Sequence, residues 1–292
     1  LVDSLFSIRY GIYPDQQPST GLQDQLGRKG SMWLYENKYT LPVAFMLPGD
    51  VEGNWLLDSG NPAVVQNDLC NVLGTRDVLV SNEGAAEGKK FTFTSEENGQ
   101  YYVYVTNKKV EKVTAAMGEK SKTFDNVDRG YFLELGYLVR GTEVELRCED
   151  DGNPTLQAEV WRFDTEAFKE FYEKMDQNPV KLSRWTDTQL SGTIHADTAG
   201  TMYTSIPYDK GWKLTVDGVE TETRSIFDTF VAADLSEGDH EITLTYEPEG
   251  LKTGAMITGV SLAVFAGAAL FTAVNEKNKK KIGKNRKNSR KM

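Results

Sequence analysis

Residues 253–275 constrain this chain more than any other feature, because TGAMITGVSLAVFAGAALFTAVN contains no Asp, Glu, Lys or Arg over 23 residues. An α-helix of that length extends about 34 Å at about 1.5 Å per residue, enough to cross a bilayer core of about 30 Å. The alternative is a buried helix of a soluble protein, but such helices are usually shorter and are not followed at once by a basic run. We therefore expect one C-terminal transmembrane helix over 253–275.

The charged residues differ on the two sides of this helix. Residues 1–275 carry 24 Lys and Arg against 42 Asp and Glu, whereas residues 276–292 carry nine basic residues and one acidic residue. A basic segment beside a span stays in the cytoplasm, which predicts a cytoplasmic tail over 276–292 and an extracytoplasmic part over 1–252. Anionic lipid headgroups attract such residues by about 1 kcal/mol each. Four of them are expected to contact headgroups: Lys277, Lys279, Lys280 and Lys281.

The start of the chain does not explain how residues 1–252 would cross a membrane. LVDSLFSIRYGIY lacks the basic and apolar regions of a signal peptide. Either a signal was removed or the chain is the C-terminal part of a longer membrane protein, and we favour the longer protein because the first residues already resemble a strand. The net charge of −10 argues against nucleic acid as a partner.

Small residues recur at every fourth position along one face of the expected span: Ala255, Gly259, Ala263 and Gly267. Small side chains let two helix backbones approach closely, and such packing drives association within lipid. We expect this face to pack against upstream transmembrane helices of the same protein, although small residues are also common in helices that only anchor a domain.

Residues 1–160 are expected to form a first β-sandwich domain with N-terminal strands and a short helix. Strands are indicated over 4–13, 33–35 and 41–45, the last two around a turn at Glu36-Asn37. The helix begins at Asn61-Pro62, because Asn is a good N-cap and Pro suits the first helical position.

The second half of this region has the period of β-strands. Apolar and polar residues alternate from Lys89 onward, as in strands with one buried face, and Asn98-Gly99 is a typical hairpin turn. The run from 85 to 160 therefore predicts an antiparallel sandwich or jelly roll.

Residues 161–252 are expected to form a helix and a second β-sandwich. Asp164 is a good cap for a helix that ends near Asp176, and Asp217-Gly218 predicts a hairpin. Six strands are indicated, over 190–195, 201–206, 212–216, 219–223, 229–233 and 241–246. The predicted fold class is mainly β: two consecutive β-sandwich domains of jelly-roll or immunoglobulin-like type with a few short helices, followed by one transmembrane helix.

Tyr208 and Trp212 are the candidate carbohydrate-binding residues. They flank a turn at 209–211, and aromatic rings at the rim of a sandwich can stack on sugar faces. Tyr and Trp also fill sandwich cores, with their polar ends bonded to a partner, and they are common at membrane interfaces. Core packing is the favoured interpretation for both residues.

The remaining chemical candidates favour structural roles. The acidic turn at 149–153 lacks the spacing of a calcium-binding loop, and Asp125 and Asp128 are interpreted in the same way. His195 and His240 are expected to be structural, and Ser59 is not in the setting of a nucleophile. Pairing of Cys70 with Cys148 stays open. We expect no catalytic residue, no metal site and no cofactor in this chain.

Five segments resemble the C-terminal part of the bacterial YfhO family of membrane proteins. They are YENKYTLPVAF (35–45), NPAVVQNDL (61–69), GYLVRGTEVEL (136–146), SIPYDKGWKLTVDG (205–218) and EGDHEITLTYEP (237–248). The order of parts, with two β-rich segments before a last span and a basic tail, is similar as well. The resemblance extends from about residue 1 to residue 275.

The resemblance implies a polytopic protein of the bacterial cell membrane, similar to GT-C-type glycosyltransferases that use lipid-linked sugars. Members of the family are associated with glycosylation of teichoic acids outside the cell, with undecaprenyl-phosphate sugar as donor. The catalytic acid is expected in an early extracytoplasmic loop, outside this chain. The implied partners are membrane lipids, upstream transmembrane helices, a cell-wall glycopolymer and the lipid-linked sugar.

Two kinds of function remain open from the sequence. In the first, the chain is the non-catalytic extracytoplasmic region of such a protein, which orients the acceptor or supports the membrane-embedded site. In the second, it is a stand-alone membrane-anchored module that binds carbohydrate or is purely structural. Spans encoded upstream of Leu1 would distinguish the first from the second.

Overall fold

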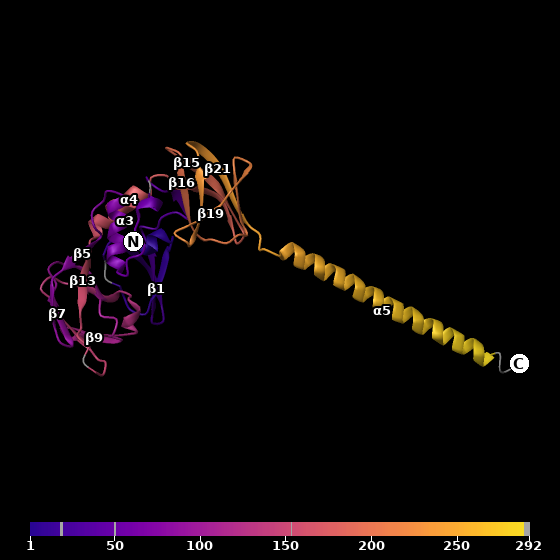
Figure 1. Ribbon diagram of the computed structural model, residues 1–292, viewed down its shortest axis with the longest axis horizontal. Helices are drawn as coiled ribbons and strands as arrows, with labels where there is room; N and C mark the ends of the chain where they lie inside the picture. Colours follow the sequence, from indigo (N-terminus) through magenta and orange to yellow (C-terminus); the bar gives the residue numbers. More distant parts are fainter. Residues whose placement is uncertain (18–19, 50, 153, 289–292) are drawn as a thin grey trace.

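The structure, a computed structural model, describes residues 1–17, 20–49, 51–152 and 154–288, apart from the side chains of 278 and 280–288. Asn153 and the side chains of Lys280 and Lys281, which the sequence analysis singled out, lie outside the described part. Figure 1 shows two β-sandwiches with helices between them, and one long helix that extends away from the second sandwich.

The first sandwich consists of a five-stranded sheet in the order β10-β9-β12-β7-β6 and a four-stranded sheet in the order β11-β8-β13-β5, all antiparallel. Its strands are β5 (Leu79–Asn82), β6 (Gly84–Glu87), β7 (Lys90–Thr94), β8 (Gly99–Val105), β9 (Lys112–Met117), β10 (Lys120–Asp125), β11 (Leu133–Leu138), β12 (Glu143–Cys148) and β13 (Ala158–Phe163). A 3₁₀ turn, η1 (Val127–Arg129), precedes β11.

The second sandwich pairs a five-stranded sheet in the order β14-β15-β21-β17-β18 with a four-stranded sheet in the order β19-β20-β16-β4. Its strands are β14 (Lys181–Thr186), β15 (Gln189–Ala196), β16 (Gly200–Pro207), β17 (Trp212–Val216), β18 (Val219–Thr221), β19 (Arg224–Ile226), β20 (Phe230–Leu235), β21 (Gly238–Tyr246) and β4 (Ala44–Met46). The prediction of a mainly β chain with two consecutive sandwiches is confirmed.

A small third sheet and four helices accompany the sandwiches. The sheet has the order β1-β3-β2, formed by β1 (Tyr10–Tyr13), β2 (Gln23–Lys29) and β3 (Met32–Asn37). The helices are α1 (Val2–Leu5), α2 (Val51–Asn54), α3 (Pro62–Val72) and α4 (Thr165–Met175). The predicted caps are confirmed, because the Asn61 side chain accepts from Ala63 N and the Asp164 side chain accepts from Glu166 N and Ala167 N.

One sheet of the second sandwich is buried on both faces. In β16, Met202 points into the core of the sandwich, whereas Tyr203 points to a separate cluster formed by α1, α3 and α4. Successive residues of a strand face opposite sides of the sheet. In β4, Phe45 therefore lies in the helical cluster, whereas Ala44 and Met46 lie in the core of the sandwich. We call this cluster the central core; it also reaches the first sandwich through Leu79 of β5.

The Asn98-Gly99 hairpin prediction was wrong. β7 precedes this dipeptide and β8 begins at its Gly99, but the two strands belong to different sheets of the first sandwich. Phe93 of β7 and Tyr101 of β8 face each other across the core, with ring centroids 6.0 Å apart. The two strands therefore pack face to face across the core instead of pairing edge to edge in one sheet. The connection between them crosses from one sheet to the other.

Two predictions near the N-terminus were also wrong. The expected strand over 4–13 is a strand only at β1, because residues 2–5 form α1. The expected pair of 33–35 with 41–45 does not form: β3 pairs with β1 and β2, and β4 pairs with β16 of the second sandwich. The domain boundaries at 1–160 and 161–252 remain a prediction. The structure shows in addition that β4, from the first of these ranges, belongs to the second sandwich.

The C-terminal helix α5 (Leu251–Asn288) contains the predicted span. Among the described residues, one helix is long and apolar enough to cross a membrane, over Leu251–Lys277, and no part of its most apolar stretch is buried in the protein. The predicted packing face, Ala255, Gly259, Ala263 and Gly267, lies on this exposed helix.

The Asp217-Gly218 hairpin between β17 and β18 is confirmed, and a hydrogen bond between Asp217 and His240 joins it to β21. Both residues have positive φ, +52° and +81°. The Asp217 carboxylate accepts from Glu241 N and lies 2.7 Å from Nδ1 of the buried His240, whose Nε2 lies 2.9 Å from Ser236 O. The hydrogen bond to Asp217, followed by the one to Ser236, raises the pKa of His240, and the same contact lowers the pKa of Asp217.

These shifts predict an optimum of stability in mildly acidic solution. The raised pKa of His240 contributes stability that is complete below its unfolded value of about 6.5 and is lost as pH rises through the folded value. The lowered pKa of Asp217 contributes stability above about 3.9 that is lost as pH falls. Thermal melts at a series of pH values from acidic to alkaline should test this. The melting temperature of the native chain should fall as pH rises through the folded pKa of His240, and this fall should be absent in His240→Gln. The control His195→Gln, which changes an exposed histidine, should show the same fall as the native chain. If the melting temperatures of all three proteins fall equally, His240 is not the group responsible.

Candidate functional site

The carbohydrate-binding candidates lie where β21 leads into α5, which we call the span-proximal end of the second sandwich. Tyr208 is 38% exposed, so the expectation that it packs in the core was wrong, and its backbone N donates to Thr229 O. Trp212 is half-buried against the core of this sandwich, and its ring centroid lies 4.9 Å from that of Tyr246. Sugar contact by these two residues remains a prediction.

The acidic turn is held by backbone contacts. Asp150 Oδ2 accepts from Glu111 N over 2.7 Å and from Lys112 N over 3.2 Å, and the thiol of Cys148 donates to it over 3.4 Å. This carboxylate therefore fastens the end of β12 to β9. Asp125 forms an ion pair with Lys112, and Asp128 lies in η1. The described residues contain no group of three His, Cys, Asp or Glu side chains that could hold a metal ion.

The remaining candidates are dispersed. His195 is exposed on β15, with Nδ1 2.7 Å from Asp239 Oδ1, and Ser59 Oγ accepts from Asn61 N just before α3. Cys70 and Cys148 are both free and buried, the first in the central core and the second in the core of the first sandwich. Among these four side chains no hydrogen bond joins a nucleophile to a base, whereas Nε2 of the buried His240 lies 3.3 Å from Ser236 Oγ.

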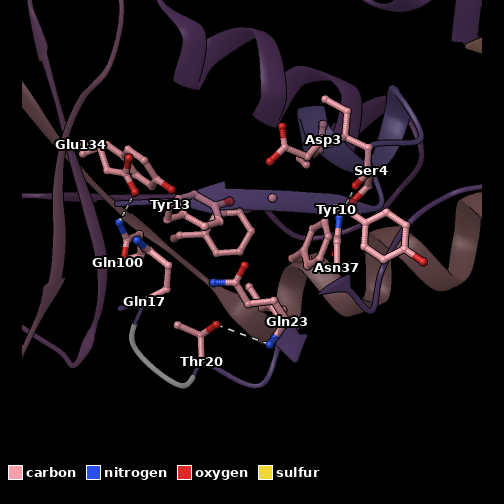
Figure 2. A pocket seen from close by; sticks show the side chains of 17 residues that line it. Asp3, Ser4, Tyr10, Tyr13, Gln17, Thr20, Gln23, Asn37, Gln100 and Glu134 are labelled. Carbon is pink, nitrogen blue, oxygen red and sulfur yellow. Dashed lines mark hydrogen bonds between the residues drawn. The ribbon is translucent and has the colours of Figure 1, made fainter. Parts of the chain in front are cut away.

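A cleft of about 400 Å³ lies where the small sheet, the first sandwich and α4 meet. This volume falls within the range of about 300–1,000 Å³ that is typical of small-molecule sites. Tyr13 and Gln17 line it from the small sheet and the loop after β1, and Gln100, Tyr102 and Glu134 from the first sandwich. Figure 2 shows Tyr13, Gln17, Gln100 and Glu134 gathered at one side. We call it the Tyr13 cleft.

Gly11 is what allows the Tyr13 ring to occupy this position. A Cβ atom on Gly11 would lie 2.6 Å from Tyr13 Cε2 and 2.7 Å from its hydroxyl, closer than real Cβ contacts. The ring also packs edge-on against the buried Tyr35, with centroids 5.8 Å apart. Tyr35 in turn accepts from Gln17 N over 3.0 Å, which fixes the start of the loop on the cleft wall.

The wall formed by the first sandwich, beside Tyr13 and Gln17, carries an amide and a carboxylate that are already joined. Gln100 Nε2 donates to Glu134 Oε1 over 2.9 Å, from neighbouring strands β8 and β11. Tyr102, two residues further along β8, packs against Phe132 with centroids 5.3 Å apart. Because alternate residues of a strand share a face, Gln100 and Tyr102 point to the same side of the first sandwich.

The electrostatics of the cleft are acidic. Burial raises the pKa values of Tyr13 and Tyr102, and the nearby carboxylates of Asp3 and Glu134 raise both further. Both phenols are therefore neutral hydrogen-bond donors at physiological pH. None of the described lining residues is Lys or Arg. The cleft can thus offer aromatic faces, amides, hydroxyl groups and carboxylate acceptors, but no Lys or Arg side chain among its described lining residues.

No pattern in the sequence predicted this cleft. Its walls come from positions 1–37, 100–134 and 163–168, which no local spacing brings together. The available signal was weak: Gly11 two residues before Tyr13, and the alternation of Gln100 with Tyr102, which marks one outward face of β8. Which outward face would be covered depends on the packing of the small sheet.

Comparison with known proteins supports one family. The family model described as bacterial membrane protein YfhO matches residues 71–258. The uncharacterized protein YfhO of Bacillus subtilis (strain 168) is 34% identical over 194 residues, which is 65% of this chain and 20% of that protein. The chain therefore spans about a fifth of the length of this curated relative.

Solved structures add nothing to this assignment. A vicilin from hazelnut (Corylus avellana) matches 60% of this chain and 82% of its own, with 8% identity and a TM-score of 0.17. A Paenibacillus glucanotransferase, crystallised with cycloisomaltoheptaose, matches 56% of this chain and 44% of its own, with 12% identity and a TM-score of 0.16. Similarities at this level carry no argument about fold or ligand.

Gly11→Ala should move the Tyr13 ring out of the cleft, because the atoms that a Cβ would meet are the flexible end of that side chain. Exposure to water should then lower the pKa of Tyr13 toward the ordinary value of about 10. Titration of ¹³C-labelled tyrosine by NMR, assigned with Tyr13→Phe, measures this. Gly27→Ala in β2, where a Cβ meets nothing within 4 Å, is the control. An unchanged Tyr13 pKa in Gly11→Ala would show that the ring does not depend on Gly11.

Proposed function

Because the chain belongs to the YfhO family of bacterial membrane proteins, we propose that it forms the non-catalytic extracytoplasmic region of a glycosyltransferase-like protein and holds a neutral saccharide in the Tyr13 cleft. The observation that carries this proposal is the composition of the cleft: the neutral phenols of Tyr13 and Tyr102, a paired amide and carboxylate, and no described Lys or Arg. The bound saccharide would be an acceptor presented to the membrane-embedded catalytic part.

The cleft has the chemistry that sugars require. The apolar C–H faces of a pyranose ring pack against aromatic rings, such as those of Tyr13 and Tyr102, while its hydroxyl groups need acceptors and donors around the edge. Glu134 supplies an ionised acceptor, and hydrogen bonds to charged groups contribute about 1.5–3 kcal/mol. Gln100 fixes the Glu134 carboxylate in position before any ligand arrives.

The charge of the cleft restricts the part of a polymer that it would hold. Two carboxylates, those of Asp3 and Glu134, line it without a described cation. Phosphate groups of a teichoic acid would be repelled by these carboxylates and by the acidic balance of residues 1–275. A neutral sugar substituent fits, and we assign to the cleft the sugar of a cell-wall glycopolymer, not its anionic backbone.

The proposal includes an orientation in the membrane. Residues 1–252 would lie outside the cell and the tail inside, where Lys277, Lys279, Lys280 and Lys281 would contact lipid headgroups. The small-residue face of α5 would pack against upstream helices, which would also carry the catalytic residues and the undecaprenyl-phosphate sugar site. This chain supplies no catalytic group of its own in this scheme.

Saccharide binding can be measured by saturation-transfer NMR on the chain in lipid nanodiscs, which avoids sugar-containing detergents. We expect methyl glycosides of neutral hexoses or N-acetylhexosamines to bind, and glucose 6-phosphate to bind more weakly than glucose. Gly11→Ala and Glu134→Gln should each weaken binding about 10-fold, which corresponds to about 1.4 kcal/mol for a lost ring contact or charged acceptor.

The variants Tyr208→Ala and Trp212→Ala test where the saccharide binds without changing the Tyr13 cleft. If the Tyr13 cleft holds the sugar, Tyr208→Ala should bind as the native chain does. Loss of binding in Tyr208→Ala or Trp212→Ala, with binding retained in Gly11→Ala, would move the site to the span-proximal end. Absence of binding to every neutral glycoside would reject the proposed function.

The packing of α5 provides a second test. In the complete protein, Gly259→Leu with Ala263→Leu should reduce the yield of folded protein in detergent several-fold, because the larger side chains hold neighbouring helices apart. Val260→Leu with Val264→Leu changes exposed positions of the same turns outside the small-residue face and is the matched control. Equal yields of folded protein from both double variants would show that α5 is only an anchor.

A further inference from the structure

Three connections lie together at the span-proximal end of the second sandwich. The strand directions place the 208–211 loop, the 227–229 turn and the end of β21 at the same end. Backbone hydrogen bonds join them: Tyr208 N donates to Thr229 O over 2.8 Å, and Glu247 N donates to Gly211 O over 2.9 Å. The start of α5 is thus attached to a defined surface of the sandwich.

The connection to α5 is short. Residues 247–250 separate β21 from α5, so the two elements lie within about 18 Å even if this segment is fully extended. Lys252 in the first turn of α5 binds the carboxylate of Glu247 at 2.7 Å, which restrains the segment further. Once α5 crosses a bilayer, the span-proximal end must lie close to the lipid surface.

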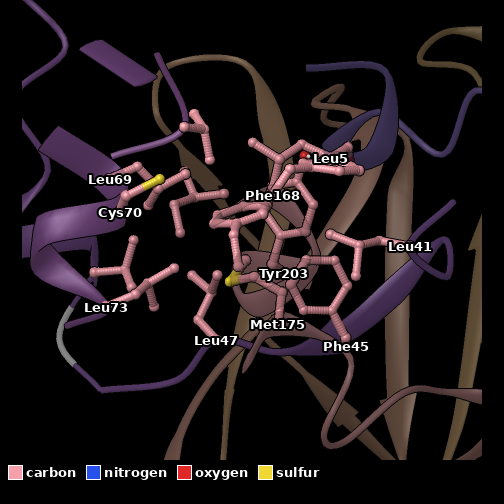
Figure 3. Packing of buried hydrophobic residues seen from close by; sticks show 14 of the residues in the cluster. Leu5, Leu41, Phe45, Leu47, Leu69, Cys70, Leu73, Phe168, Met175 and Tyr203 are labelled. Atoms are coloured by element: carbon pink, nitrogen blue, oxygen red, sulfur yellow. Dashed lines mark hydrogen bonds between the residues drawn. The ribbon is translucent and has the colours of Figure 1, made fainter. Parts of the chain in front are cut away.

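An apolar pocket of about 180 Å³ lies beside this end. It is lined by residues of the central core, of which Leu5, Leu47, Leu69, Met175 and Tyr203 are seen together in Figure 3. Its rim includes Phe227 and Thr229 of the 227–229 turn, which brings it to the span-proximal end. Phe6 and Leu57, which also line it, are 45% and 43% exposed, and the adjacent Leu56 is 62% exposed.

The exposed apolar rim is held in place by specific contacts. The Trp55 indole donates to Val65 O over 2.8 Å, and Leu56 N donates to Asp68 Oδ2 over 2.8 Å, so the loop after α2 is fixed on α3. The Phe227 ring packs edge-on against Trp55 at 4.9 Å, although Phe227 has a positive φ of +52° that is unfavourable for a bulky residue. The rim is therefore built to present apolar side chains.

We propose that the rim formed by Phe6, Leu56, Leu57 and Phe227 rests on the lipid bilayer and inserts into its outer interface. The occupant is lipid because the short connection to α5 brings this end to the membrane surface, where exposed apolar side chains gain by leaving water. This inference rests on α5 crossing the bilayer and is independent of the Tyr13 cleft. It implies that the sandwich is held at a fixed depth against the membrane.

The charges around the rim indicate the kind of lipid contact. Asp58 and Asp228 directly follow Leu57 and Phe227, Asp209 and Lys210 lie together in the 208–211 loop, and Lys252 lies in the first turn of α5. With both signs present, there is no basic patch to attract anionic headgroups. Insertion should therefore occur equally in membranes with and without phosphatidylglycerol.

Site-specific fluorescence on the chain in nanodiscs tests the proposal. Leu57→Cys is labelled with the dye NBD, and Val219→Cys serves as the matched control, because Val219 is 68% exposed at the opposite end of the second sandwich. The native thiols are buried, and burial raises the pKa of Cys70 to about 11, so both should stay unlabelled. If Leu57→Cys fails to fold, Leu56→Cys, outside the pocket, replaces it.

We expect NBD at position 57 to be quenched by nitroxide-labelled lipids at least twice as strongly as NBD at position 219, and to be protected from aqueous iodide. Iodide quenching equal at both positions would place the rim in water and overturn the proposal. Protection from both quenchers would show that protein, such as a second copy of the chain, covers the rim, and would overturn it as well. Lipid quenching that requires phosphatidylglycerol would overturn the apolar mechanism.

Discussion

Burial of one β-sheet on both of its faces holds this protein together. The sheet β19-β20-β16-β4 completes the core of the second sandwich with one face and the central core with the other, and β4, β16 and β20 alternate between these two apolar environments. Phe45 in β4 and Tyr203 in β16 carry the second contact, with ring centroids 5.1 Å apart. The Tyr203 hydroxyl also donates to Leu5 O over 3.2 Å, which ties the N-terminal segment to a sheet almost 200 positions later.

Both cavities depend on this central core. Phe168 of α4 lines the Tyr13 cleft, whereas Met175 at the other end of α4 lines the apolar pocket, and both are buried in the central core. The cleft and the pocket are thus two openings of one packed region, one bordered by polar strands of the first sandwich and the other by the span-proximal end. In a membrane protein of this family, that arrangement would keep a saccharide site at a set distance from the lipid surface.

The sequence predicted the parts of the fold that depend on local signals. The caps at Asn61 and Asp164, the Asp217-Gly218 hairpin and six strands of the second sandwich follow from residues that are adjacent in the chain, whereas β14 and β19 were not predicted. Asn98-Gly99 failed as a hairpin because a dipeptide specifies a turn but not whether the next strand joins the same sheet or the opposite one. The pairing of β4 with β16, across more than 150 residues, left no local signal at all.

The sequence by itself determined that this chain is mainly β, carries a helix able to span a membrane and belongs with a known family, because periodicity, composition and family similarity are all written along the chain. Only the tertiary structure decided that Gly11 and Tyr13 meet Gln100, Tyr102 and Glu134 in one cleft, and that Phe6 and Leu57 meet Phe227 beside the start of α5. These sites join segments that are distant in sequence. Their formation depends on how three apolar cores pack against one another, which no spacing of residues encodes.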